Sequence, residues 1–69
     1  MYTPGDLVVV NDTCPLPYFI GKTALVIANM GMDSTDHSHG WYYRLEFHDG
    51  KYHIFTHKEL TLLSKGRKQ

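Results

Sequence analysis

The tripeptide Gly21-Lys22-Thr23 has the residue types that end a phosphate-binding loop. A complete loop needs a further glycine five positions before Gly21, and that position is Leu16. The residues after Thr23 read ALVIANM, which predicts a strand where a phosphate loop requires a helix. The tripeptide therefore does not predict a nucleotide loop, and Gly21 is better explained as a turn glycine that opens a strand.

The segment Asp36-His37-Ser38-His39 is the second group whose residue types could do chemistry. Imidazole is the commonest metal ligand, and residues two apart on an extended chain point the same way. A structural zinc site needs four ligands, so Cys14 or His57 would have to complete it, and no spacing requires this. The pattern favours a polar loop in which His37 and His39 are only weak metal-ligand candidates, and we expect no cofactor.

The sequence suggests no catalytic residues. No Ser-His-Asp or Cys-His arrangement can be inferred, and Cys14 lies between Thr13 and Pro15 without an obvious activating neighbour. A chain of 69 residues also has little room to build a deep pocket. We therefore expect that the protein is not an enzyme.

The composition is that of one small globular domain, with 42% hydrophobic residues. Seven basic and seven acidic residues give a formal net charge of zero, whereas nucleic-acid-binding domains of this size are usually basic. A single cysteine excludes an internal disulfide, and no apolar run approaches the roughly 18 residues of a membrane span. We expect a cytoplasmic protein without membrane contact, with one domain over 1–64 and a flexible basic tail over 65–69.

Turn residues divide the chain into five short strand patterns, at 7–10, 23–30, 41–48, 51–56 and 60–63. Between the first two, Pro15 and Pro17 predict an extended loop. The segment Thr56-His57-Lys58-Glu59 has the form of a capping box but is too short for a helix. It therefore predicts a single 3₁₀ turn before the last strand.

The dipeptide Asp49-Gly50 between two strand patterns predicts a hairpin with a two-residue turn. Such a turn places Phe47 opposite Tyr52 and Glu46 opposite His53, and alternation then defines two faces. The predicted core face comprises Tyr43, Leu45, Phe47, Tyr52 and Ile54. The predicted outer face comprises Tyr42, Arg44, Glu46, His48, Lys51, His53 and Phe55.

Two segments resemble the KOW-type domains of ribosomal proteins and transcription elongation factors. The chain has Gly5-Asp6-Leu7-Val8-Val9-Val10 and then Gly21-Lys22-Thr23-Ala24-Leu25-Val26, similar to Gly-Asp-x-Val-x-Val followed by Gly-Lys-x-Gly-x-Val. The strand order as a whole resembles an SH3-like barrel. The resemblance implies an all-β fold, a small five-stranded, partly open SH3-like barrel with a 3₁₀ turn before the last strand.

The first binding hypothesis is a non-catalytic protein-binding adaptor or regulatory module. By analogy, a small accessory or viral-type protein acting on a host complex would fit this size. Tyrosine and arginine are enriched at protein-binding hot spots. The residues predicted to contact the partner are Tyr18, Tyr42, Arg44, Lys51, His53 and Phe55. An exposed sheet edge is compatible with a monomer or a weak homodimer.

The alternative hypothesis is a nucleic-acid-binding, KOW-like domain associated with transcription or translation. Phosphates would be contacted by Lys22, Arg44, Lys51, Lys58, Lys65, Arg67 and Lys68. Tyr42 and Phe55 would stack on bases. The neutral net charge favours the protein partner, whereas the KOW resemblance favours nucleic acid.

Overall fold

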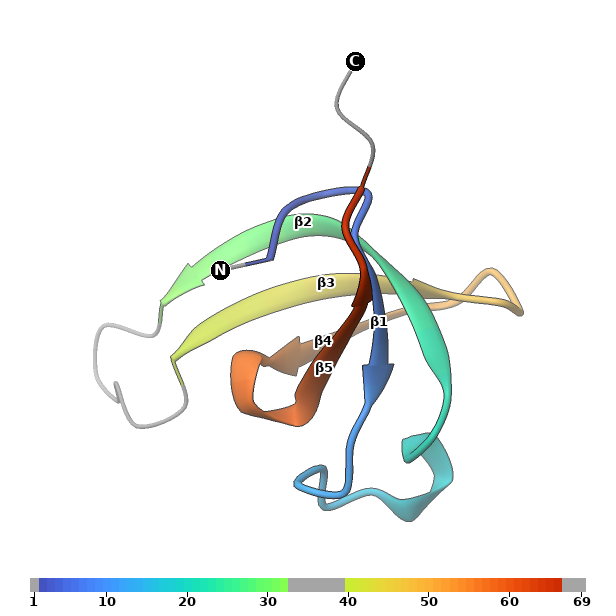
Figure 1. The fold of residues 1–69 in the computed structure, drawn as a ribbon. Helices are drawn as coiled ribbons and strands as arrows, with labels where there is room; N and C mark the ends of the chain where they lie inside the picture. Colours follow the sequence, from blue (N-terminus) through green and yellow to red (C-terminus); the bar gives the residue numbers. More distant parts are fainter. Residues whose placement is uncertain (1, 33–39, 67–69) are drawn as a thin grey trace.

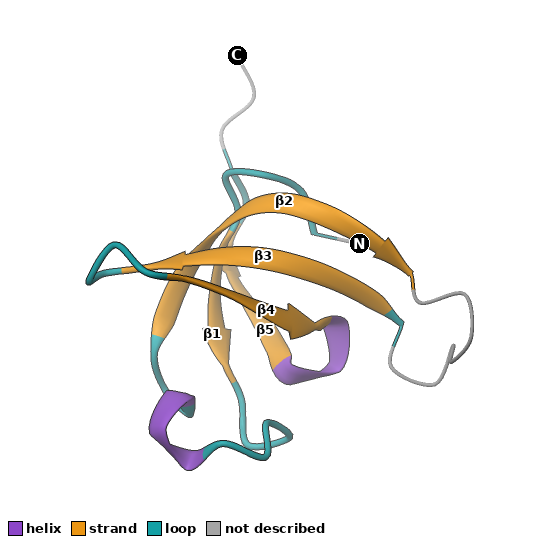
Figure 2. Cartoon of the chain, turned by 180° about the vertical axis from the view of Figure 1, so that it is seen from behind, coloured by secondary structure: helices purple, strands orange, loops and turns teal. Residues whose placement is uncertain are grey.

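The computed structural model describes residues 2–32 and 40–66, which form one antiparallel sheet of five strands. The strands are β1 (Leu7–Val10), β2 (Thr23–Met32), β3 (Trp41–Phe47), β4 (Tyr52–Thr56) and β5 (Leu60–Ser64) (Figure 1). Their order across the sheet is β4-β3-β2-β1-β5. Two short 3₁₀ helices, η1 (Pro17–Phe19) and η3 (His57–Glu59), lie in the connections before β2 and β5 (Figure 2).

The sheet curls around one face without closing. Strand β2 has ten residues, and its register with β3 shifts between Val26 and Ala28 and again between Asn29 and Gly31. Irregularities of this kind bend a strand and increase its twist, and β2 arches over the fold in Figure 1. Strands β4 and β5 are the two edges of the sheet. The expected partly open barrel is therefore, within the described residues, an open curved sheet.

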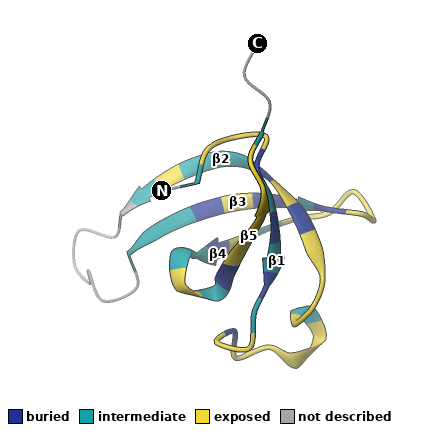
Figure 3. Cartoon of the chain, in the orientation of Figure 1, coloured by how far each residue is buried: buried dark blue, intermediate teal, exposed yellow. Residues whose placement is uncertain are grey.

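The apolar core lies on the inward face of the curved sheet, and Figure 3 colours its buried positions dark blue. Its buried members are Val8, Val10, Cys14, Ala24, Val26, Tyr43, Leu45, Phe47, Phe55 and Leu60. The five predicted strands and the 3₁₀ turn before β5 are confirmed, with small differences at the strand ends. Helix η1 was not predicted, because the two prolines indicated a fully extended loop.

The turn between β3 and β4 contains three residues, His48, Asp49 and Gly50, where two were predicted. The Gly50 amide donates to the Phe47 carbonyl at 2.9 Å, and the Phe47 amide donates to the Lys51 carbonyl at 3.0 Å. A two-residue type I′ turn needs positive φ at both central residues, but in this turn only Gly50 has it, at +82°. The turn is therefore a type I turn followed by a glycine bulge.

The additional turn residue moves β4 by one position along β3 and exchanges its two faces. Tyr52 lies opposite Glu46, and Ile54 lies opposite Arg44. Phe55 is in the core with 4% of its surface exposed, whereas Tyr52 and Ile54 are 58% and 53% exposed. The predictions that put Tyr52 and Ile54 in the core and Phe55 on the outer face were therefore wrong.

The predicted faces of β3 are confirmed, because the register error affects only β4. Tyr43, Leu45 and Phe47 are buried as expected. His53 lies opposite Leu45 and is half-buried on the core side, so the expected cross-strand pair of Glu46 with His53 was wrong.

Valine at position 50 should destabilise the protein through backbone strain alone. A Cβ atom added to Gly50 would meet no heavy atom within 4 Å, but a β-branched residue at φ +82° is strained. We expect Gly50→Val to lower the free energy of unfolding by about 1–3 kcal/mol in a urea titration. Gly50→Asn is the matched control and should cost less, because asparagine tolerates this conformation. Equal stability of all three proteins would contradict the turn.

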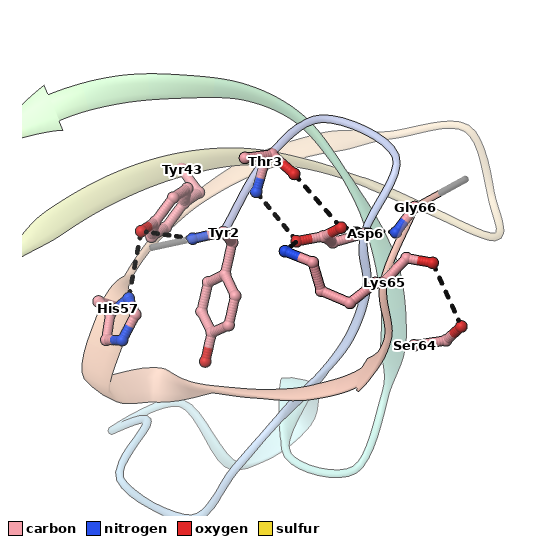
Figure 4. A network of polar contacts seen from close by, with 8 residues as sticks. All are labelled: Tyr2, Thr3, Asp6, Tyr43, His57, Ser64, Lys65 and Gly66. Atoms are coloured by element: carbon pink, nitrogen blue, oxygen red, sulfur yellow. Dashed lines mark hydrogen bonds and ion pairs between the residues drawn. The ribbon is translucent and has the colours of Figure 1, made fainter. Parts of the chain in front are cut away.

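A buried carboxylate joins the two ends of the described chain (Figure 4). Asp6 has no exposed surface, and it accepts amide hydrogen bonds from Gly66 at 2.6 Å and from Thr3 at 3.0 Å. Lys65 Nζ lies 3.4 Å from Asp6 Oδ2. Burial by itself would raise the pKa of Asp6, but these hydrogen bonds and the lysine charge outweigh it and lower the pKa below its ordinary value. Lys65 and Gly66, which were assigned to the tail, are thus held against the start of β1.

A second polar network satisfies the hydroxyl of buried Tyr43 (Figure 4). Tyr43 Oη accepts the Tyr2 amide at 3.1 Å and lies 3.1 Å from His57 Nδ1. The Tyr2 ring stacks on the His57 ring with centroids 4.5 Å apart. Burial lowers the pKa of His57, which favours the neutral ring, whose Nδ1 can accept a hydrogen bond from the Tyr43 hydroxyl. The contact between Tyr2 and His57 therefore holds the beginning of the described chain against η3.

Candidate binding sites

Five side chains define a surface that we call the β3–β4 outer face: Tyr42, Arg44, Glu46, Tyr52 and Ile54. The guanidinium carbon of Arg44 lies 6.0 Å from the Tyr52 ring centroid, within the range of a cation–π contact. Leu25 on β2 lies opposite Glu46 and is 45% exposed, which extends the apolar surface onto the next strand. The surface combines aromatic, aliphatic and arginine side chains, as protein-binding hot spots often do.

Within residues 2–32 and 40–66, β4 pairs with β3 on one side only, so the β3–β4 outer face continues to a sheet edge that no described strand covers. The backbone bond between Phe47 and Lys51 at the turn sets the phase of the ladder. Bonded and non-bonded pairs alternate along an antiparallel ladder, so the N–H and C=O groups of Tyr52 and Ile54 point away from β3. Strand β4 thus presents open backbone groups and exposed apolar side chains at the same two residues.

At Thr56, the next position of β4 whose backbone groups point away from β3, the amide is already bonded within the protein. The Thr56 amide donates to Glu59 Oε1 at 2.9 Å, which is the Glu59 half of the predicted capping box. This contact agrees with the phase of the ladder and ends the open part of the edge. In the part of the chain that the structure describes, the unpaired segment of this edge therefore extends over 52–54.

A cleft of about 590 Å³ lies between the η1 loop and the β3–β4 turn, on the inward side of the hairpin. Its aromatic lining comes from Tyr18, Phe19, Phe47 and the two histidines His48 and His53. The Phe19 ring centroid lies 5.5 Å from that of Phe47 and 5.3 Å from that of Phe55. These contacts fasten the η1 loop to the core, so the cleft has a fixed aromatic wall.

The charged lining of this cleft is mainly cationic. Lys22 and Lys51 line it together with one carboxylate, Asp49, whose Oδ1 accepts the Lys51 amide at 3.0 Å. Lys22 Nζ lies 4.7 Å from the centroid of the Tyr18 ring, and Tyr18 is 71% exposed. An ammonium group and an open aromatic ring are therefore neighbours at the mouth of the cleft.

The residues predicted to contact a protein partner are divided among three places. Tyr42 and Arg44 lie on the β3–β4 outer face, whereas Tyr18, Lys51 and His53 line the cleft on the other side of the hairpin. Phe55 is buried in the core and cannot contact a partner. The predicted contact residues therefore do not form one surface, because the shifted register turns His53 and Phe55 inward.

The residues predicted to contact nucleic acid are also dispersed. Lys22 and Lys51 share the cleft, Lys58 is exposed on η3, and Lys65 contacts Asp6. Of the predicted stacking pair, Phe55 is in the core and Tyr42 is half-buried. Arg67 and Lys68, and the weak metal candidates His37 and His39, lie outside the described residues.

Several residues of these surfaces had no signal in the sequence. Tyr52 and Ile54 were assigned to the core because of the predicted two-residue turn. Phe19 and Phe47 were not expected to line a cleft, since they meet only when the loop before β2 folds against the hairpin.

The turn-glycine interpretation of Gly21 is confirmed by its φ of +87°.

Within residues 2–32 and 40–66, no group of three or more histidine, cysteine, aspartate and glutamate side chains is placed to hold a metal ion. The same part of the chain contains no helix that is long and apolar enough to span a membrane. Comparisons with protein-family models, curated proteins and solved structures find no match to this chain.

Proposed function

We propose that this protein is a non-catalytic protein-binding module whose partner adds a β-strand to the edge of β4. One observation carries the proposal: the open backbone groups of Tyr52 and Ile54 coincide with their exposed side chains. In strand addition, backbone hydrogen bonds provide affinity and alternate side chains provide specificity. A free apolar edge also promotes aggregation, so an edge of this kind is more readily understood if a partner covers it.

The chemistry of the β3–β4 outer face limits what the partner strand can carry. Tyr52 and Ile54 would pack against apolar side chains that project to the same face. Arg44 lies opposite Ile54 on the neighbouring strand, with its guanidinium 6.0 Å from the Tyr52 ring centroid, and would favour an acidic side chain of the partner. We therefore expect an extended partner segment that alternates apolar residues and includes an acidic one.

We also propose that the curved sheet is an opened relative of the SH3-like barrel with KOW-like features. The strand order β4-β3-β2-β1-β5 and the 3₁₀ turn before β5 support this relationship. Gly5-Asp6 and Gly21-Lys22 stand before β1 and β2, where the resembling segments place them.

Affinity capture tests the proposed function. The tagged full chain is used to capture proteins from a nuclease-treated lysate, in parallel with Ile54→Lys and with Leu62→Lys. A lysine on an edge strand opposes strand pairing, and Leu62 provides a matched position on the other edge strand, where it is 38% exposed. We expect the same protein partner with wild type and Leu62→Lys, and at least about a tenfold loss with Ile54→Lys.

Two outcomes would contradict the proposed function. The first is equal capture by Ile54→Lys and wild type at equal melting temperature. The second is loss of the captured protein on nuclease treatment, which would mean that nucleic acid bridges it to the bait.

A further inference from the structure

We propose that the cleft between the η1 loop and the β3–β4 turn binds a nucleoside phosphate. The cleft and the β3–β4 outer face are on opposite sides of the hairpin, so this inference does not rest on the proposed function. The volume of about 590 Å³ is within the range of small-molecule sites, which is about 300–1,000 Å³.

The aromatic lining suits a flat ring. Phe19 packs against His53 with ring centroids 4.8 Å apart, and Tyr18 meets Phe19 edge to face at 5.1 Å. Because Phe19 also contacts the core through Phe47, this wall does not need to move when a ligand enters. Tyr18 is 71% exposed, so a nucleobase can reach its ring without opening the core.

The charges beside this wall suit a phosphate. Lys22 and Lys51 are two cations against one carboxylate, Asp49, in a chain whose formal net charge is zero. Lys22 Nζ lies over the Tyr18 ring, 4.7 Å from its centroid, so the cation covers one face of the ring and a base would stack on the other face. A base and its phosphate are similarly adjacent in a nucleotide, and this complementarity favours a nucleoside phosphate over a neutral aromatic ligand.

The proposed site is not the phosphate-binding loop that the sequence excluded. Gly21, Lys22 and Thr23 do line the cleft, but β2 and not a helix follows them. The phosphate would be held by lysine side chains and not by a cradle of backbone amides. The nucleoside phosphate could be free or part of a single strand, and both sources share this chemistry.

NMR titration of the ¹⁵N-labelled full chain tests the inference with thymidine 5′-monophosphate, thymidine and inorganic phosphate as probes. We expect the monophosphate to bind at least about tenfold more tightly than either fragment, with amide shifts at the cleft residues. Lys22→Gln and Tyr18→Ala should each weaken binding by about tenfold, whereas Lys58→Gln is the matched control and should leave it unchanged. Both cleft side chains are exposed, so these variants should stay folded.

The oligonucleotide (dT)₆ distinguishes the two sources of the ligand. Affinity equal to that of the monophosphate would support a free nucleotide, and much tighter, salt-dependent binding that still needs Tyr18 and Lys22 would support a single strand. Three results would overturn the inference. The first is that neither the monophosphate nor (dT)₆ binds, and the second is that both cleft variants bind as tightly as wild type. The third is that an acidic tyrosine-containing peptide binds while the monophosphate does not. Ile54→Lys should leave nucleotide binding unchanged, so this inference and the proposed function can fail separately.

Discussion

Replacement of Phe55 with alanine is expected to lower the free energy of unfolding by about 3–5 kcal/mol. Phe55 is 4% exposed, and its ring centroid lies 5.3 Å from that of Phe19 and 5.8 Å from that of Phe47. Removal of the ring would leave a cavity at the point where the η1 loop, β3 and β4 meet. For a domain of this size the loss is a large part of the total stability, which is typically about 5–15 kcal/mol.

Tyr52→Ala is the matched control for Phe55→Ala, because both residues are aromatic and lie on the same short strand. Tyr52 is 58% exposed, so its truncation should cost less than about 1 kcal/mol. Urea titration of the two variants provides the comparison. A two-residue turn at Asp49-Gly50 would reverse the faces of β4 and exchange the two results, so a larger effect of Tyr52→Ala would contradict the observed register.

Replacement of Asp6 with alanine is expected to cost about 3 kcal/mol. The substitution removes the acceptor of the Gly66 and Thr3 amides and leaves Lys65 without its ion pair. Hydrogen bonds to a charged group contribute about 1.5–3 kcal/mol each, and the amides left behind carry a further penalty where water cannot reach them. Asp12→Ala, at an exposed aspartate, should stay within about 0.5 kcal/mol of wild type.

The contribution of Asp6 should also disappear in acid. Its pKa in the folded protein is lower than the ordinary value of 3.8, so the unfolded chain takes up the proton first as the pH falls. The stabilisation is complete above pH 3.8 and is lost as the pH falls through the lower folded-state pKa. The difference in stability between wild type and Asp6→Asn should therefore shrink below about pH 4. A difference that is constant from pH 7 to pH 2 would contradict this role of Asp6.

The strands and the 3₁₀ turn could be predicted because their signals are local. Glycine and proline separate the apolar runs, and the Thr56–Glu59 capping box lies within one turn. Asp49-Gly50 marked the hairpin correctly but did not determine its register, since the same dipeptide fits a two-residue turn and a three-residue turn with a bulge. The distinction depends on the φ angle of Asp49.

Side-chain type could not correct the register either. Strand β4 alternates Tyr52 and Ile54 with His53 and Phe55, so each candidate face contains one aromatic and one other side chain that can be buried. The observed choice is favoured by Phe19, which packs on both His53 and Phe55. That contact depends on the fold of a loop more than thirty residues earlier in the sequence.

The Asp6 network and the cleft could not be predicted from the sequence for the same reason. The Asp6 carboxylate is satisfied by Gly66 and Lys65, which are about sixty residues away along the chain. The cleft forms only where the η1 loop meets the β3–β4 turn. Long-range contacts of this kind leave no periodic signal in one sequence.

Amide hydrogen exchange on the isotopically labelled chain, free and bound to its captured partner, is the most direct test of strand addition at β4. The amides of His53 and Phe55 bond to β3 and should be protected in both states. The amides of Tyr52 and Ile54 point to the open edge, so we predict rapid exchange in the free protein and protection in the complex. Rapid exchange of both Tyr52 and Ile54 in a saturated complex would contradict partner binding at this edge.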